Sequence, residues 1–380
     1  MVNLFNVEAI ESAKPVLLMI VVQSIYALVN IMFKIVINDG TSLSILIAYR
    51  FIFSTAFIVP FAILFERKSV HSLTGRVIFQ AFLCGLFGGS LQQNLYVKSL
   101  ALVSTTYTVA MLNLIPAITY IMVVSLRMEK PNLGTSAGNA KLLGTLVGIG
   151  GAMILTLYKG RRLFNWSMHS DLLQHASSPP QGAPAKSHMW GIMLALATSF
   201  NFSLWFIIQS KMTQNFPWHY SIAALTSIMS AIQSIVYALC TERYRSQWKL
   251  DWNLRLLTVA SAGILASGTC FVLLAWCVRL KGPLFVSAFN PLTLLMVALA
   301  GSVLLNEYIT IGSLIGAVLI VCGLYMLLWG KSKETRKVES EIMSAKGPIK
   351  CDSIHISNEK KAASVGPVKS STLNNTSGKV

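Results

Sequence analysis

Long apolar stretches alternate with short polar ones along most of the chain. Ten of these stretches approach the length of about 20 helical residues that crosses roughly 30 Å of hydrocarbon. We predict helices rather than barrel strands, because backbone in lipid must satisfy its own hydrogen bonds and these stretches lack strand-like alternation. The predicted spans are 15–37, 43–65, 77–97, 104–126, 141–158, 188–210, 219–240, 255–277, 283–305 and 309–330.

The first five spans and the last five carry the same landmarks in the same order. The second span of each set ends at a Glu-Arg pair, Glu66-Arg67 and Glu242-Arg243, and the fourth ends at a glutamate, Glu129 and Glu307. Because five is an odd number, the second copy must lie inverted in the membrane. The pattern predicts an all-α membrane protein with ten transmembrane helices in two inverted five-helix repeats, which is a common build of secondary transporters.

These repeats divide the chain into five segments. We expect a short N-terminus (1–14), a first repeat (15–158), a linker loop (159–187), a second repeat (188–330) and a tail (331–380). The tail is polar and almost without aromatic residues, so it cannot bury enough apolar surface to order itself. We predict a disordered tail that tethers the protein; regulation through its serines is the alternative.

Composition supports a membrane protein, with 54% hydrophobic and 12% charged residues and a mean hydropathy of +0.62. The net charge of +17 would suggest nucleic acid as the partner of a soluble protein. Here the Lys and Arg residues lie mainly in loops and the tail, where they orient the spans and contact lipid headgroups, so we expect no nucleic-acid partner. Their distribution favours both termini in the cytosol. No sorting signal is evident, and we favour the plasma membrane over the vacuolar membrane.

Nothing in the sequence supports catalysis, a metal site or a cofactor. The six cysteines are scattered and form no C-x-x-C motif. A G-x-S-x-G match at residues 134–138 lies in a short loop rather than on a strand-to-helix turn, so we interpret it as chance. Glycines spaced by four recur in matching places of the two repeats, at Gly144/Gly148 and Gly312/Gly316, and allow close helix packing. We assign these two helices to a scaffold and expect a monomer or a weak homodimer.

Polar residues inside the spans are the sharpest functional signal, because each is costly in lipid and tends to face the bundle interior. Several form stripes at helical spacing, and Pro116 and Pro291 interrupt two spans near mid-membrane. We interpret the stripes together as lining a polar cavity, although each single amide could equally join helices. The candidate substrate-binding residues are Gln23, Tyr26, Asn30, Arg50, Gln92, Gln93, Tyr96, Asn113, Tyr120, Trp205, Gln209, Asn290 and Thr293.

Arg50 has two interpretations. Its two-pronged guanidinium could hold a substrate carboxylate. Alternatively it has a structural role, by extending to the interface or by pairing internally, and we favour this structural role. For Glu129 and Glu307 we favour pairing at helix ends over proton coupling.

Several strings resemble a known family. Residues 93–96, 113–120 and 127–129 resemble the first repeat of EamA-type plant drug/metabolite transporters, and 281–286, 290–292, 305–307 and 323–331 resemble the second. The chain is most similar to the nodulin-21-like group, also called walls-are-thin-related or UMAMIT transporters. Asn306 and Asn290 depart from the residues usual in that family, and the tail has no counterpart.

This resemblance implies ten helices, cytosolic termini and a central cavity lined by spans 1, 3, 4, 6, 8 and 9. It also implies facilitated or proton-influenced movement of amino acids, auxin or related metabolites. We therefore expect a carrier of amino acids or similar small organic solutes that works by alternating access, with a small-molecule substrate and the lipid bilayer as its partners. An auxin or aromatic-acid carrier is the alternative within transport. A non-transporting membrane scaffold or accessory subunit is the alternative from another class.

Overall fold

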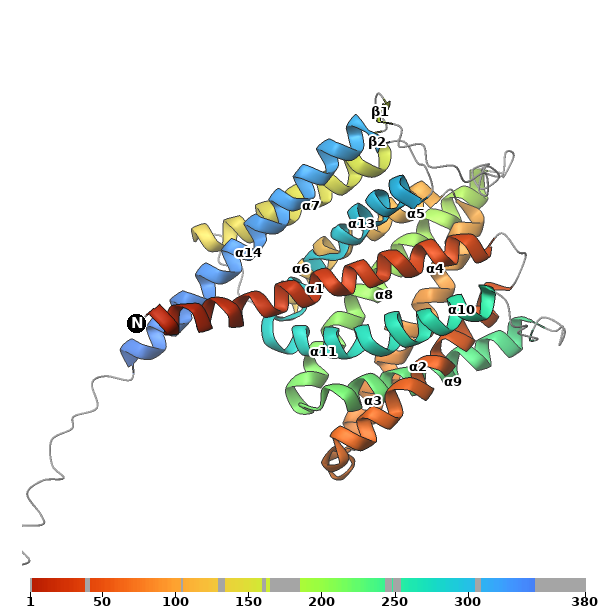
Figure 1. Cartoon of the computed structure of the whole chain (residues 1–380), viewed down its shortest axis with the longest axis horizontal. Coiled ribbons are helices and arrows are strands. Elements are labelled where there is room, and N and C mark those ends of the chain that lie inside the picture. The colour runs from red at the N-terminus through yellow and green to blue at the C-terminus, as the bar shows by residue number, and fades with distance from the viewer. Residues whose placement is uncertain are drawn as a thin grey trace, which may run out of the picture. The chain divides into compact units, whose positions relative to one another are not determined.

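A computed structural model describes residues 2–37, 42–103, 105–128, 134–158, 162–164, 185–242, 248, 254–304 and 309–345. In these ranges the chain is almost entirely helical (Figure 1). The first half contains α1 (Val2–Ile37), α2 (Leu43–Phe65), the 3-10 turn η1 (Arg67–Ser72), α3 (Gly75–Gly85), the π-helical segment η2 (Leu86–Ser90), α4 (Leu91–Leu102), α5 (Thr105–Leu112), α6 (Ile115–Ser125) and α7 (Ser136–Leu157).

The second half repeats this order. It contains α8 (Ala185–Asn215), α9 (His219–Thr241), α10 (Leu254–Ser261), the π-helical segment η4 (Ala262–Thr269), α11 (Cys270–Lys281), α12 (Pro283–Ala288), α13 (Asn290–Leu304) and α14 (Ile311–Ala345). Two short antiparallel strands, β1 (Arg162–Phe164) and β2 (Ile309–Thr310), lie close to the ends of α7 and α14 (Figure 1).

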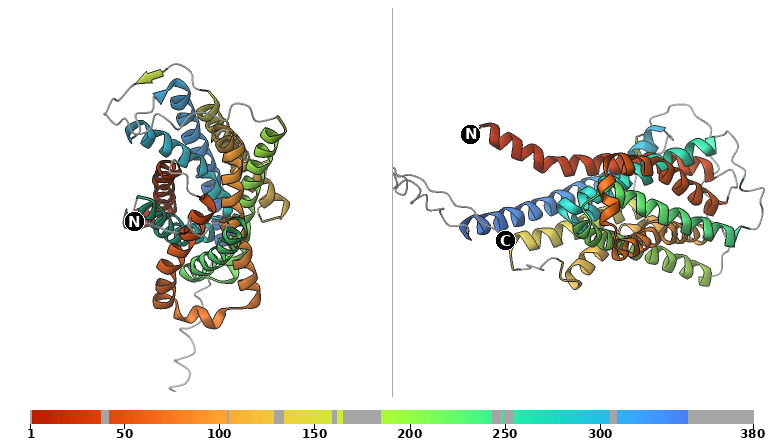
Figure 2. Two further views of the ribbon diagram at one scale, coloured as in Figure 1. Left: turned by 90° about the vertical axis from the view of Figure 1, so that its right-hand side faces the viewer. Right: turned by 90° about the horizontal axis from the view of Figure 1, so that it is seen from below.

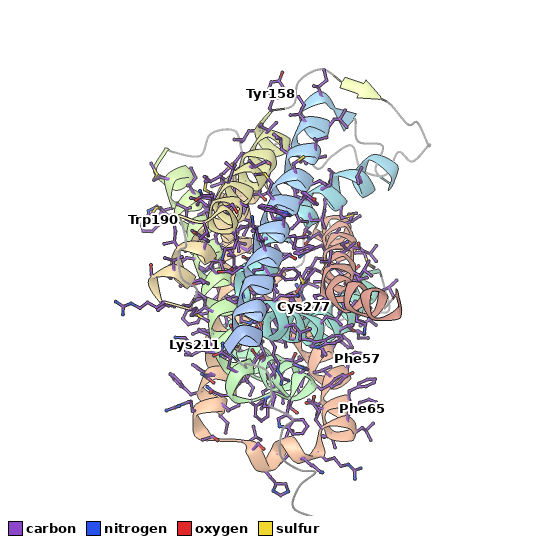
Figure 3. The ribbon with its side chains drawn as sticks, turned by 90° about the vertical axis from the view of Figure 1, so that its left-hand side faces the viewer. Phe57, Phe65, Tyr158, Trp190, Lys211 and Cys277 are labelled. Carbon is purple, nitrogen blue, oxygen red and sulfur yellow. The ribbon has the colours of Figure 1, made fainter. Side chains whose placement is uncertain are left out.

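Seven helices among the described residues are long and apolar enough to cross a membrane. They belong to α1, α2, α7, α8, α9, the α10–α11 run and α14. Large apolar side chains project from the outside of the bundle, as Phe65 and Trp190 do in Figure 3, with 67% and 59% of their surfaces exposed. Such an exposed apolar surface suits lipid rather than water.

The two second helices of the repeats, α2 and α9, lie antiparallel and are joined at both ends. At one end the Glu66 carboxylate accepts hydrogen bonds from the backbone N–H groups of Tyr220 and Ser221, at 3.2 and 2.8 Å. At the other end Ser42 Oγ donates to Glu242 Oε1 at 2.6 Å. Each glutamate thus ends one helix and contacts the first turn or N-cap of the other, as expected for two copies related by inversion.

The repeats interlock instead of forming separate domains. Helix α1 packs against α10, α11 and α13 of the second half, and α8 packs against α4, α5 and α6 of the first (Figure 2). In the same way α2 packs on η4, and α9 packs on η2. Consequently residues 1–333 form one compact unit, and the repeat boundaries that appear in sequence do not correspond to independent cores.

Helices α7 and α14 lie side by side with almost no space between their backbones (Figure 1). A Cβ on Gly144 would lie 2.7 Å from the carbonyl oxygen of Gly323, and one on Gly316 would lie 2.7 Å from the carbonyl oxygen of Gly151. The recurring glycines therefore serve contact within one chain, which agrees with the predicted scaffold role.

The last helix continues past the predicted start of the tail at residue 331. Helix α14 extends to Ala345, through a segment rich in Lys, Glu, Ser and other residues that tolerate helix. Helical residues of opposite charge at spacings of three and four, such as Lys331 and Lys337 around Glu334 and Lys337 with Glu341, favour this continuation. The predicted tail from 346 to 380 lies outside the described residues, as does most of the linker.

Candidate substrate-binding site

The fourth helix of each repeat is interrupted near its middle. Asn113 and Leu114 separate α5 from α6, and Phe289 separates α12 from α13. Pro116 and Pro291 follow directly, and a proline has no N–H to continue the helical ladder. The interruptions that the two prolines predict are therefore present in both halves. At each break, the missing proline N–H removes a hydrogen bond from the helix inside the bundle.

Serines on α8 compensate part of the first interruption. Ser199 Oγ donates to the carbonyl oxygen of Met111 at 2.8 Å, and Ser203 Oγ donates to that of Ile115 at 3.2 Å. Backbone carbonyls released at a break in an apolar interior need such partners. These two contacts fix the position of α8 along the interrupted helix.

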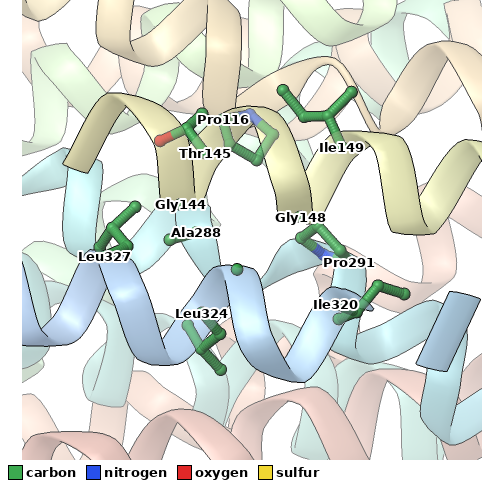
Figure 4. A pocket seen from close by; sticks show the side chains of 11 residues that line it. Pro116, Gly144, Thr145, Gly148, Ile149, Ala288, Pro291, Ile320, Leu324 and Leu327 are labelled. Carbon is green, nitrogen blue, oxygen red and sulfur yellow. The ribbon is translucent and has the colours of Figure 1, made fainter. Parts of the chain in front are cut away.

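The two interruptions approach one another beside α7 and α14. Pro116 and Pro291 both line a narrow cavity with a free volume of about 10 Å³, together with Gly144, Gly148 and Leu324 (Figure 4). Thr145 supplies the single polar side chain of the lining, and its hydroxyl donates to the carbonyl oxygen of Lys141 at 2.8 Å. None of the candidate residues lines this cavity. It is an apolar packing gap between the two breaks rather than a binding site for a polar solute.

The third helix of each repeat contains a matching irregularity. The π-helical segments η2 and η4 interrupt α3–α4 and α10–α11 at equivalent places. Such segments inside α-helices frequently mark functional sites. Sequence periodicity did not predict them, because a π segment has no strong local signal.

The polar stripe of α1 lies on the inner side of that helix. Gln23 is 1% exposed, and its Oε1 accepts a hydrogen bond from Thr293 Oγ1 of α13. Asn30 is exposed, but it lies only about 20° from Gln23 around the helix. The exposed Val21 and Leu28 lie about 140–160° away, on the opposite face. The opening beside Asn30 therefore belongs to the bundle interior rather than to the lipid-facing surface.

Arg50 is buried, with 8% of its surface exposed, and its Nε donates to Ser267 Oγ of η4 at 2.7 Å. Its guanidinium also lies over the Phe51 ring, 5.8 Å from the centroid. Tyr26 is half-buried. The hydrogen bond of Arg50 thus joins α2 to η4, which supports the structural role favoured for this residue.

The amides of α4 include one atom without a partner. Gln92 is 5% exposed, and its Oε1 has no hydrogen-bond partner among the described residues. Gln93 and Tyr96 are half-buried. Because a buried unpaired amide oxygen costs about 1–3 kcal/mol, Gln92 is a position where a solute could restore a hydrogen bond.

Asn113 and Asn290, beside the two breaks, make few contacts. Asn113 Nδ2 donates to Thr156 Oγ1 of α7 at 3.5 Å, which is long for a hydrogen bond. Asn290 Nδ2 has no partner among the described residues. Tyr120, one to two turns beyond the first break, is half-buried.

The candidates on α8 lie deeper in the core than the stripe predicted. Trp205 is 1% exposed and packs against Phe206 and Phe271, with ring centroids 5.0 and 5.5 Å away, and closely against Gly88. Its Nε1 and the Oε1 of Gln209 lack partners among the described residues. Trp205 is thus part of an aromatic core, and it could reach a solute only through its polar edge.

Two polar groupings emerge from these contacts. The first consists of two hydrogen bonds, Thr293–Gln23 between α13 and α1 and Arg50–Ser267 between α2 and η4. The second lies between α4 and α8, where the contacts Gly88–Trp205 and Val103–Gly191 set a register that brings Gln92 to the level of Asn201.

Asn201, Ser267 and Thr119 are not among the candidate binding residues, although the sequence offered Ser267 as a possible contribution of span eight. Asn201 is 8% exposed, and both hydroxyl-bearing residues are fully buried. Asn201 lies one turn before Trp205, at the edge of the predicted stripe of α8. Thr119 and Ser267 are small residues that often bond to their own helix, which hides their signal in sequence.

Comparison with known proteins decides the family. A model of the EamA-like transporter family matches residues 13–157 and 189–329, which is most of the chain. The chain belongs to the EamA-like transporter family. It is a plant drug/metabolite transporter of the EamA type, and hence a multi-pass membrane protein that faces lipid.

Relatives of this EamA-like transporter cover nearly its whole length. The WAT1-related protein At1g68170 of Arabidopsis thaliana is 40% identical over 326 residues, which cover 86% of this chain and 92% of the relative. The WAT1-related protein At1g25270 of the same plant is 37% identical over 327 residues, with the same coverage. A crystal structure with 15% sequence identity has the same fold, with a TM-score of 0.63 over 83% of this chain and 96% of that one.

Proposed function

We propose that this EamA-like transporter carries amino acids or similar small organic solutes by alternating access. One observation supports this most strongly. Buried amide atoms without partners, Gln92 Oε1, Gln209 Oε1 and Asn290 Nδ2, occur in both repeats on or near the interrupted helices. Interrupted helices at a repeat interface are a usual place for the substrate site of a secondary transporter.

In the proposed topology the chain crosses the membrane ten times. The seven long apolar helices are joined by α3–α4, α5–α6 and α12–α13, which are interrupted by a π segment or a break. Repeats at 15–158 and 188–330 then have opposite orientations, and both termini lie in the cytosol. We place the protein in the plasma membrane.

The amides would bind the polar ends of the solute, and the two breaks would let the half-helices move against the repeat interface. Asn113, Gln92, Asn290, Gln23 and Thr293 would form this site, with Asn30, Gln93, Tyr96 and Tyr120 along the path. Tyr26, Trp205, Gln209 and Arg50 would line its more deeply buried parts. Facilitated and proton-influenced transport both agree with this arrangement.

Counterflow tests the proposal directly. Purified protein in liposomes preloaded with unlabelled amino acids should accumulate labelled amino acids, and excess unlabelled amino acid should saturate the flux. A pH gradient then separates a facilitator from a proton-influenced carrier. Saturable flux of indole acetic acid alone would favour an aromatic-acid carrier, for which the aromatic core around Trp205 and the buried Arg50 provide a rationale. Absence of flux for every solute would favour a scaffold or accessory subunit.

A further inference from the structure

A second cleft lies at the end of the bundle where α6, α8 and α11 finish. It is partly open to solvent and has a free volume of about 130 Å³. Its lining is polar, with Ser210, Thr213 and Gln214 from α8 and Arg279 from α11. In the proposed topology this end of the bundle faces the cytosol.

Each chain segment around this cleft brings at least one basic residue. Arg279 lines the cleft itself, and Arg127, Lys211 and Lys281 are sequence neighbours of the lining residues Met128, Ser210 and Gly282. Segments 123–128, 210–214 and 278–283 contain no Asp or Glu. Glu129, the residue after Met128, lies outside the described residues. When its charge is counted as well, the four basic residues still leave a net positive charge.

The Arg279 guanidinium is held at the cleft by its neighbours. One Nη donates to the carbonyl oxygen of Pro217 at 3.1 Å and lies 3.5 Å from His219 Nε2. The Glu66 carboxylate accepts the hydrogen bonds at the start of α9, and its single negative charge is outnumbered by the four basic residues around the cleft. Arg279 is exposed, so its charge remains available to solutes in the cleft.

The cleft lies one helical turn from a residue of the proposed site. Thr213 lies one turn from Gln209 on the same face of α8, and Gln209 is the 2% exposed amide whose Oε1 lacks a partner. Gly282, with φ 85° in the left-handed region, joins α11 to the half-helix α12 at the edge of the cleft. Only glycine adopts this conformation without strain, so Gly282 fixes how α12 begins.

We infer that this cleft is an entry vestibule that concentrates organic anions, with Arg279 as its principal charge. Like charges around a low-dielectric cleft focus the potential and raise the local concentration of oppositely charged solutes. The inference rests on the proposed transport function and adds solutes of net negative charge as the preferred class at this face. The competing explanation is that these residues only orient the spans, in which case their charge would not act on solutes.

Charged thiol reagents measure the potential in the cleft without any substrate. Gln214→Cys places an exposed thiol in the lining, in a background where Cys351 and the exposed Cys240 and Cys322 are serine. In nanodiscs, the reaction rate with an anionic methanethiosulfonate should exceed that with a cationic one. Arg279→Gln should lower this rate ratio about three- to tenfold. Arg76→Gln, which removes an exposed charge on α3 away from the cleft, should leave the ratio unchanged.

Transport provides the second readout. Arg279→Gln should raise the KM for glutamate entering from the cleft side and leave that for glutamine unchanged. An equal rate ratio in the Arg279→Gln and parent proteins would overturn the vestibule, whatever the transport result. If the parent protein shows no counterflow of any solute while Arg279→Gln still lowers the rate ratio, the proposed transport function fails and the anion-concentrating cleft stands.

Discussion

Glu66 at the end of α2 holds the first turn of α9 through Ser221, whose N–H and hydroxyl each lie 2.8 Å from Glu66 Oε2. A carboxylate at a helix N-terminus pairs with unsatisfied N–H groups and with the positive end of the helix dipole. The mirror contact, Ser42 with Glu242, joins the same helices at the opposite end. The glutamates of the two Glu-Arg landmarks that reveal the repeat are therefore also residues that join the repeats.

Removing this carboxylate should destabilise the fold. Glu66→Ala leaves the N–H groups of Tyr220 and Ser221 without their acceptor, and we expect a loss of about 1–2 kcal/mol. Thermal unfolding of the detergent-purified protein, followed by tryptophan fluorescence, should show a lower Tm. Arg67→Ala changes the exposed neighbouring residue and should leave the Tm unchanged. Equal Tm values for both variants would show that the Glu66 contact contributes nothing.

Helices α2 and α9 should move as one body during transport, because they are joined at both ends and in the middle. Ser54 Oγ and Ser227 Oγ lie 2.9 Å apart, close enough for a disulfide in Ser54→Cys/Ser227→Cys. The oxidised double variant should retain most of its counterflow, with each single variant as a control. A block that a reductant reverses would show that these helices must separate.

Two neighbouring glycines on α7 offer a matched test of the scaffold. A Cβ on Gly151 would lie 2.7 Å from Leu319 Cβ and 2.8 Å from the backbone nitrogen of Ile320, whereas a Cβ on Gly150 meets nothing within 4 Å. Gly151→Ala should therefore lower stability by about 1–3 kcal/mol. Gly150→Ala should be neutral or raise stability by up to about 1 kcal/mol, because alanine favours helix. A lower Tm for Gly150→Ala than for Gly151→Ala in thermal unfolding would contradict the close contact of α7 and α14.

The fold was more predictable from sequence than the site. Pro116 and Pro291 act locally, so their positions correctly predicted breaks in two helices, and the spaced glycines correctly predicted a close helix pair. Gln23 was correctly placed on an inner face, because its stripe has a clear period. The partner of Glu66 could not be predicted, since it lies 155 residues away along the chain.

The depth of individual side chains depends on neighbours that sequence alone does not identify. Trp205 was expected to form a cavity wall, but Gly88 and Phe271 enclose it in the core. Asn201 was missed because its importance depends on the register between α4 and α8. Helix α14 continues to Ala345 because its polar end still favours helix, although its composition resembles a tail.

The most direct test of the proposed carrier compares two asparagines. Asn113 lies at the break between α5 and α6 and is 4% exposed, whereas Asn139 is exposed on α7. The single 3.5 Å hydrogen bond of Asn113 contributes little to stability, so Asn113→Ala should fold and melt like the parent protein. In liposome counterflow, Asn113→Ala should lose about tenfold in transport efficiency, the equivalent of one hydrogen bond to the solute, and Asn139→Ala should transport normally. Normal counterflow by Asn113→Ala would contradict a substrate site at the interrupted helices.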